Sequence, residues 1–426
     1  MYLTDEEKRM LAGEKGFVPR LCMEYLVEMS GVAGAERLVE LDGTADFHVP
    51  FTAMVPHYEF PIEELRKIAA DGAHFALPTF ANKGPCYGGT FVDGWEASGY
   101  APHDEPDYHE RAMQREWMEL YIRMGLITTY SCAIYLAASY WPTPGQHCAW
   151  NESSAVPYCN AVLGGRSNID GSFASAFLGK APYYGMHITE NRYATVVIDT
   201  ERKIQTDIEW DVLGFAVGEE CRLAVPALIH TGKPTTTQYQ KFNTAANTGG
   251  SIAMYHVPGS TPEAPTLEFA LGGKKPKREV MIDDAWLKRT YEKLNYHKGD
   301  SVEMVSLGCP HLNLVDLEKI ARKLEGRKSK VPFWIMTVPT LYHQAEQLGY
   351  RKIFEDAGAT FLSGTCPGAI GGIPDGVHAL AVDAAKQAYY ISGLFPDEDN
   401  TLDVFYGTQD DCIDAALAGR WHGEWR

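Results

Sequence analysis

The feature that most constrains this fold is a regular alternation of short β-rich runs and amphipathic helices between Val302 and Gly368. Such alternation is typical of a parallel sheet whose strands are joined by crossover helices. Because parallel strands all end at the same edge, ligands bind beyond that edge. The segment predicts strands at Val302–Leu307, Phe333–Thr337 and Thr360–Leu362, helices at Leu314–Leu324 (N-cap Asn313) and Leu341–Ala357, and loops at Gly308–His311 and Gly364–Gly368.

Three cysteines occur in similar surroundings. Cys309 and Cys366 fall just beyond predicted strand ends, so we expect them to be close in space although they are far apart in sequence. Cys132 also follows an apolar run and has small neighbours. Thiolates bind iron–sulfur clusters and zinc, which makes the three cysteines candidate metal ligands. The alternative is that each is a small buried apolar residue.

The rest of the chain predicts further α/β units. Helices are expected after the capping box Thr4-x-x-Glu7 and at Phe17–Met29, Pro61–Gly72, Glu105–Met124 and Thr236–Ala246, and a strand at Tyr193–Asp199. We therefore predict an α/β protein with several parallel or mixed sheets and flanking helices. A basic connection, Gly272–Arg278, marks the predicted boundary between an N-terminal region (1–275) and a C-terminal domain (276–426).

Charge and composition exclude some classes of function. The formal net charge of −18 argues against nucleic acid or an anionic membrane as a partner. The chain contains no apolar run long enough to span a bilayer, and its acidic N-terminus lacks a leader pattern, so a cytoplasmic location is expected. In such a reducing compartment, the 9 cysteines are predicted to be free thiols or metal ligands rather than disulfides.

Other polar residues are candidates for chemistry. Glu152 lies among polar residues between apolar runs, where a carboxylate can act as a general base; the alternative is a first-turn helix acid. Arg166, followed by Ser167 and Asn168, offers a carboxylate-binding fork; the alternative is a helix C-cap with a stabilising arginine. Lys386 is the last candidate, and its alternative is a solvated helix face.

Several motifs in combination resemble the aconitase X family, a divergent branch of the aconitase superfamily. They are Ala149–Val156, Asn160–Asn168, Pro182–His187 with Glu190–Arg192, and Leu307–Leu312, together with the opening Leu3–Gly13 and Gly34–Leu38. The resemblance extends over nearly the whole chain. It implies aconitase-like catalytic domains.

The resemblance also implies a dehydratase that eliminates water from a small hydroxy-carboxylate, such as cis-3-hydroxy-L-proline or mevalonate 5-phosphate. Family members hold an iron–sulfur cluster through three cysteines, which carry over to Cys132, Cys309 and Cys366. Three ligands leave one iron open as a Lewis acid. Whether the cluster is 2Fe–2S, 3Fe–4S or 4Fe–4S stays open.

Site roles follow from the same resemblance. The residues expected to be catalytic are Glu152, Ser153 and Lys386, and those expected to bind substrate are Asn82, Arg166, Ser167, Asn168 and His187.

The chain also departs from the family pattern. Single-chain members continue into a swivelling domain that supplies a catalytic serine; this chain stops at Arg426, so we expect a separate small subunit. The context of Cys132 and the segments Phe47–Phe51 and Phe80–Cys86 are altered, which leaves the substrate open. Two alternatives remain. One is a catalytically silent binding or scaffold subunit, and the other is a lyase with a single iron or zinc ion.

Overall fold

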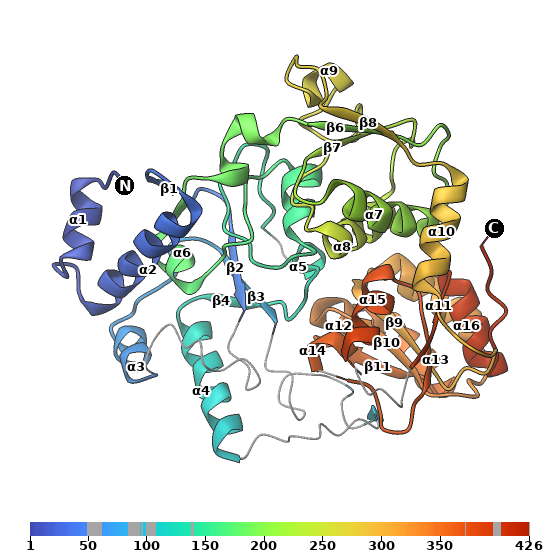
Figure 1. Ribbon diagram of the computed structural model, residues 1–426. Coiled ribbons are helices and arrows are strands. Elements are labelled where there is room, and N and C mark those ends of the chain that lie inside the picture. Colours follow the sequence, from blue (N-terminus) through green and yellow to red (C-terminus); the bar gives the residue numbers. More distant parts are fainter. Residues whose placement is uncertain are drawn as a thin grey trace.

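A computed structural model describes residues 1–48, 62–83, 94, 97–98, 108–137, 140–370, 372–394 and 402–425. Figure 1 shows N-terminal helices and a small sheet on one side, a middle α/β layer, and a C-terminal α/β unit below that layer. The structure thereby confirms the predicted α/β class with parallel sheets and flanking helices. The boundary expected near residue 275 stays a prediction.

The helices are distributed over the whole described chain. They are α1 (Asp5–Leu11), α2 (Phe17–Ala33), α3 (Ile62–Ala70), α4 (Tyr108–Arg123), α5 (Ile134–Ala137), the π-helix η3 (Tyr158–Leu163), α6 (Phe173–Leu178), the short 3-10 helices η4 (Gly185–His187) and η5 (Thr189–Arg192), α7 (Asp207–Cys221), α8 (Thr236–Gly250), α9 (Leu267–Ala270), α10 (Asp284–Leu294), α11 (Leu314–Leu324), α12 (Pro339–Gln347), α13 (Tyr350–Asp356), α14 (Pro367–Ile370), α15 (Ala385–Leu394) and α16 (Gln409–Ala418). Among the described residues, no helix has the length and apolar character needed to cross a membrane.

The strands of the described residues form four sheets. Three are parallel: β2 (Ala45–His48), β3 (Thr79–Lys83) and β4 (Leu126–Thr128); β7 (Pro226–Ile229), β6 (Val196–Asp199) and β8 (Arg278–Met281); and β11 (Thr360–Ser363), β10 (Phe333–Thr337), β9 (Met304–Leu312), β12 (Ala379–Val382) and β13 (Asp403–Tyr406). The fourth is an antiparallel pair, β1 (Leu38–Glu40) with β5 (Lys180–Pro182).

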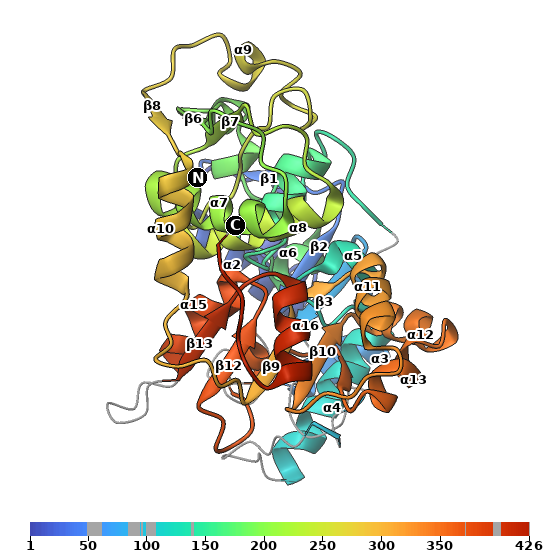
Figure 2. The same cartoon turned by 90° about the vertical axis from the view of Figure 1, so that its right-hand side faces the viewer.

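The five-stranded sheet positions the candidate site. Its strand order is β11-β10-β9-β12-β13. The chain adds β10 and β11 on one side of β9 and then β12 and β13 on the other side, so β9 and β12 flank the topological switch point, where ligands bind in open α/β sheets. Both faces are covered, since Leu380 and Val382 pack into the core that includes α15, whereas Ala381 packs into the core of α11 and α16. In Figure 2, α16 lies in front of the sheet. This two-sided burial explains the continuous apolar strands.

Two predicted elements were wrong in detail. Gly308–His311 is not a loop, because β9 continues to Leu312 through an irregularity at which its register with β10 shifts. Gly308 permits this shift, since its φ is 120° and a Cβ there would lie 2.4 Å from the Met336 carbonyl oxygen. Likewise, the predicted helix Leu341–Ala357 is two helices, interrupted where Gly349 adopts a φ of 81°.

Other local predictions were confirmed. Thr4 and Glu7 form a reciprocal capping box at the start of α1. The side chain of Asn313 accepts a hydrogen bond from the Asp316 amide at 3.1 Å, which caps α11. The bounds of α11 and β10 match the prediction because their signals are local: a cap, an amphipathic period and a short β-rich run.

Helices α7 and α8 pack unusually closely because glycines line their contact. A Cβ at Gly214 would lie 2.6 Å from the Phe242 carbonyl oxygen, and one at Gly249 would lie 2.5 Å from that of Phe215. Helix α8 continues through Gly249 and Gly250, beyond its predicted end at Ala246. The backbone contact fixes α8 beside the segments that bear the site.

We expect Gly214→Ala to lower the free energy of unfolding by about 1–3 kcal/mol, because backbone rather than a flexible side chain meets the new methyl group. The matched control is Gly31→Ala in α2, where nothing lies within 4 Å of the new Cβ. There the alanine should stabilise by about 0.5–1 kcal/mol. Urea unfolding of both variants checks this, and equal effects at the two positions would contradict it.

Candidate active site

The three cysteines that the sequence analysis predicts as metal ligands lie close together in the fold. Cys132 lies between β4 and α5, Cys309 lies within β9, and Cys366 lies between β11 and α14. The thiols of Cys309 and Cys366 are hydrogen-bonded to each other, and both lie within electrostatic range of Cys132. None of the three forms a disulfide. Burial, with a smaller effect from the Glu152 carboxylate, raises the pKa of the Cys132 thiol to about 12.

A buried charged pair lies beside the cysteines. Lys386, at the start of α15, places its Nζ 3.5 Å from Glu152 Oε1 and 2.8 Å from Ser154 Oγ. Burial alone would lower the pKa of Lys386, but the Glu152 carboxylate beside it outweighs this effect and holds the pKa above its ordinary value. The solvated helix face considered for Lys386 is therefore wrong, since its side chain is buried. The site contains a permanent cation.

Two serines adjoin the carboxylate of this pair. The Ser153 hydroxyl donates a hydrogen bond to Glu152 Oε1 at 3.1 Å, and the Ser154 amide approaches the same oxygen at 3.3 Å. Glu152 also lies in a first helical turn, because its carbonyl accepts the amides of Ala155 and Val156. Glu152 thus matches both the functional interpretation and its structural alternative. Ser154 was missed because nothing in the sequence distinguishes it as a partner of Lys386.

Two further residues at the site could not be identified from the sequence. His311 is buried, and its ring nitrogens lie 2.8 Å from Ser131 Oγ and 2.8 Å from the Thr365 carbonyl oxygen. Tyr135, one turn beyond Cys132, stacks on Tyr158 with ring centroids 3.9 Å apart, and its buried hydroxyl has no hydrogen-bond partner among the described residues. The position of His311 two residues after Cys309 is the one signal that points to it.

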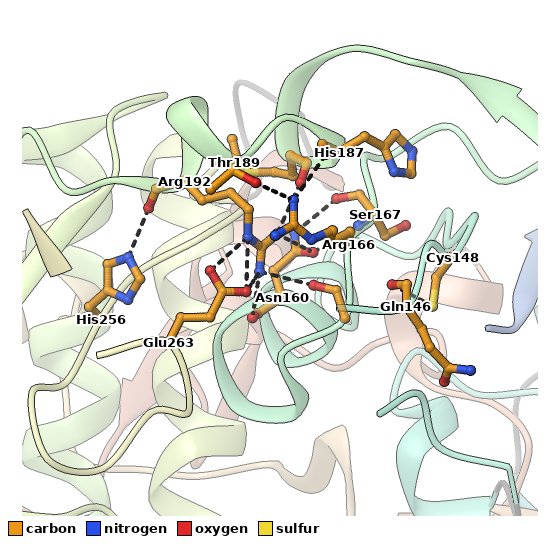
Figure 3. Close-up of polar contacts among 12 residues, drawn as sticks. Gln146, Cys148, Asn160, Arg166, Ser167, His187, Thr189, Arg192, His256 and Glu263 are labelled. Atoms are coloured by element: carbon orange, nitrogen blue, oxygen red, sulfur yellow. Dashed lines mark hydrogen bonds and ion pairs between the residues drawn. The ribbon is translucent and has the colours of Figure 1, made fainter. Parts of the chain in front are cut away.

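Arg166 and His187 form a second group. The Arg166 Nη1 donates to the His187 carbonyl at 3.1 Å and to Thr189 Oγ1 at 3.0 Å (Figure 3). The ring of His187 lies against that of His147, with 2.9 Å between their Nδ1 atoms. Burial, aided by the positive charges nearby, lowers the pKa of His187 to about 3, so the ring is neutral. These bonds connect the group to its own loop rather than to the cysteines.

Ser167 and Asn168 are engaged in hydrogen bonds with the backbone. Ser167 Oγ accepts the Trp150 amide at 2.7 Å and donates to the Asn168 carbonyl, and the side chain of Asn168 bonds to the Tyr184 carbonyl and the Met186 amide. These bonds link the Arg166 loop to the strand-like segment that leads to Glu152. Asn82 lies in β3, and its side chain is outside the described part of the structure.

A buried arginine supports the Arg166 loop. Arg192 pairs with Glu263 at 2.5 Å and donates to the carbonyls of Gly165 and Asn160 at 3.0 and 3.2 Å (Figure 3). Gly164, with a φ of 77°, caps η3 immediately before this loop, as the C-cap alternative predicted. Arg192 therefore holds the Arg166 loop in place. The sequence motif Glu190–Arg192 does not indicate this role.

No three histidine, cysteine, aspartate or glutamate side chains in the described residues lie close enough to share one metal ion. An iron–sulfur cluster requires a wider spacing of its cysteine ligands than a single metal ion does, because each thiolate binds a different iron.

Comparisons with known proteins give a consistent result. The models of the Aconitase X first, second and third domains match residues 1–190, 194–292 and 302–418. The phosphomevalonate dehydratase large subunit of Thermococcus kodakarensis is 33% identical over 92% of this chain and 95% of its own length. The cis-3-hydroxy-L-proline dehydratase of Pseudomonas aeruginosa is 30% identical over 97% of this chain and 70% of its own.

The structural comparison agrees. A holo-form crystal structure of Thermococcus kodakaraensis aconitase X aligns with a TM-score of 0.79 and 30% identity, covering 98% of this chain and 100% of that one.

Removing one member of the buried pair should be costly. We expect Lys386→Met to lower the free energy of unfolding by about 3–5 kcal/mol, because Glu152 then stays buried without its cation. Adding Glu152→Gln should restore part of this loss. Lys352→Met, which breaks the exposed pair with Asp356, is the control and should change stability little. Chemical denaturation measures all of these variants, and a Lys386→Met protein as stable as wild type would refute the pairing.

Proposed function

Because the chain belongs to the aconitase X family, we propose that it is a hydro-lyase that eliminates water from a small hydroxy-carboxylate. The observation that carries the proposal is the meeting of Cys132, Cys309 and Cys366 with the buried Lys386–Glu152 pair. The names of the relatives, phosphomevalonate dehydratase large subunit and cis-3-hydroxy-L-proline dehydratase, support the reaction class. Both names refer to a hydroxy-carboxylate.

We propose that Cys132, Cys309 and Cys366 hold an iron–sulfur cluster. The donor set fits, since burial raises the pKa of the Cys132 thiol, which therefore keeps its proton until a metal displaces it, and Lys386 offsets the negative charge of the resulting thiolates. A single zinc or iron ion fits less well, because its ligands must all lie about 2.3 Å from one atom. When bound through three thiolates, a cluster supplies an open iron as Lewis acid for the departing hydroxyl.

The residues around the cysteines supply the proton chemistry. Lys386 keeps its ammonium proton and thereby favours the ionised form of Glu152, which we assign as the base that removes the proton from the carbon next to the hydroxyl. Ser153 orients this carboxylate through its hydrogen bond to Oε1. Tyr135 places an unshared hydroxyl in the same buried region of the described structure.

Substrate binding is assigned to the neighbouring loop. Arg166 uses Nη1 within the protein, so a substrate carboxylate would be held through Nε and Nη2. Ser167 and Asn168 hold this loop in place through hydrogen bonds to the backbone. His187 does so through its carbonyl, which accepts from Arg166, and through its ring, which contacts His147. Asn82 remains a proposed substrate contact from the resemblance alone.

We also propose a small partner subunit. Relatives from Thermococcus kodakarensis and Methanothermobacter thermautotrophicus are each named a large subunit, which implies a smaller companion. Full dehydratase turnover by this chain purified alone would refute this part of the proposal.

The activity test begins with anaerobic purification and reconstitution with iron and sulfide, in the presence of any co-purifying subunit. We expect water elimination from a member of a hydroxy-carboxylate panel that includes mevalonate 5-phosphate and cis-3-hydroxy-L-proline, followed by NMR. Glu152→Gln should lower kcat by about 10²–10⁴-fold while the cluster is retained.

The ligand assignment is tested separately by metal content. Cys309→Ser should lose bound iron and its visible absorption. Cys412→Ser should keep both, because this buried cysteine of α16 has charged side chains rather than thiols around it. Iron retention by Cys309→Ser would contradict the assignment. A wild-type chain without iron after reconstitution would favour the silent-subunit alternative.

A further inference from the structure

We propose that His311 is a positioning residue that ties together the chain segments bearing the three cysteines and so sets the spacing of their thiols. Its effect on a cluster rests on the function proposed above. The hydrogen bonds of His311 that support the proposal do not depend on that function, because they are formed within the protein alone.

His311 joins two segments that are distant in sequence. Its Nδ1 lies 2.8 Å from the hydroxyl of Ser131, which directly precedes Cys132, and its Nε2 lies 2.8 Å from the carbonyl oxygen of Thr365, which directly precedes Cys366. The side chain is only 3% exposed. One imidazole therefore connects the residue that precedes Cys132 to the residue that precedes Cys366.

The third cysteine belongs to the segment of His311 itself. Cys309 precedes it by two residues in β9, and the His311 carbonyl accepts a hydrogen bond from Gln240 Nε2 of α8 at 2.5 Å. The closely packed α7–α8 pair thus anchors this end of β9. The consequence is that a single buried side chain connects all three cysteine-bearing segments.

The hydrogen positions follow from the partners. A carbonyl oxygen only accepts, so Nε2 carries the hydrogen, and the neutral ring must then accept the Ser131 hydroxyl hydrogen at Nδ1. Ser131 Oγ in turn accepts the Ala133 amide at 2.9 Å. These hydrogen bonds therefore hold Ser131 and Ala133, the residues on either side of Cys132, in place.

This arrangement excludes two other roles. Both ring nitrogens of His311 are occupied by protein partners, so the ring serves neither as a metal ligand nor as a general base unless one of these bonds breaks. What remains is orientation of the residues that hold the cysteines. Such supporting contacts around a metal site commonly contribute about 10–100-fold in metal affinity.

A purely structural role is the competing explanation, and the chain offers a matched control for it. His256 is also buried, at 2% exposed, and its Nε2 bonds to the Arg192 carbonyl at 2.8 Å. This bond involves none of the cysteine-bearing segments. His256→Ala thus removes a similar buried ring and a similar bond elsewhere.

The test compares full-length wild type, His311→Ala, His311→Gln, Ser131→Ala and His256→Ala. After anaerobic reconstitution, the readouts are iron and sulfide per chain, the rate of iron loss to a chelator, and the absorption and paramagnetic resonance spectra. We expect His311→Ala to lose iron about 10–100-fold faster and to change the spectra. His311→Gln should recover part of the loss, since its amide can still donate to Thr365, and Ser131→Ala should show a weaker effect. His256→Ala should keep wild-type iron retention and spectra.

A second readout uses the metal-free chain. Hydrogen–deuterium exchange at the amides of 131–133 and 365–366 should become faster in His311→Ala and stay unchanged in His256→Ala. If wild type takes up no cluster, the proposed function fails, and this exchange still decides the role of His311. Wild-type iron retention and exchange in His311→Ala, or equal losses in His311→Ala and His256→Ala, would overturn the proposal.

Discussion

A buried ammonium group is the constraint on which the candidate site depends. Lys386 is removed from water at the start of α15, and such a charge is tolerated only when negative or polar partners surround it. Glu152 and Ser154 supply these partners from a segment more than two hundred residues earlier in the chain. The pair therefore joins the segments matched by the first and third Aconitase X domain models. It also places a cation beside thiols that must become thiolates to bind metal.

Two kinds of contact hold the rest of the site in place. Backbone carbonyls are gathered by buried side chains: Arg192 holds those of Asn160 and Gly165, and His311 holds that of Thr365. Glycines allow close approach where a Cβ would clash, as at Gly214 against α8 and at Gly308 against β10. Both kinds of contact position chain segments through the backbone.

Local signals in the sequence predicted local structure well. The Asn313 cap and the amphipathic period of α11 gave its bounds, and the β-rich run at Phe333–Thr337 gave those of β10. The prediction failed where backbone freedom mattered, at the irregular strand after Gly308 and at the break at Gly349, because a glycine permits a positive φ without requiring it. At the site, the cysteines were found through their positions after β-rich runs and through resemblance. Tyr135 carried no pattern of its own, and His311 was indicated only by its place two residues after Cys309.

By itself, the sequence determined the α/β class, the parallel C-terminal sheet and the closeness of Cys309 and Cys366, because a hydrophobic period and caps act over a few residues. Only the tertiary structure decided which partners those residues have. It brought Lys386 to Glu152, and it placed His311 between the segments that precede Cys132 and Cys366. The physical reason is that burial and pairing of charge depend on neighbours contributed by distant segments, and no local pattern records these neighbours.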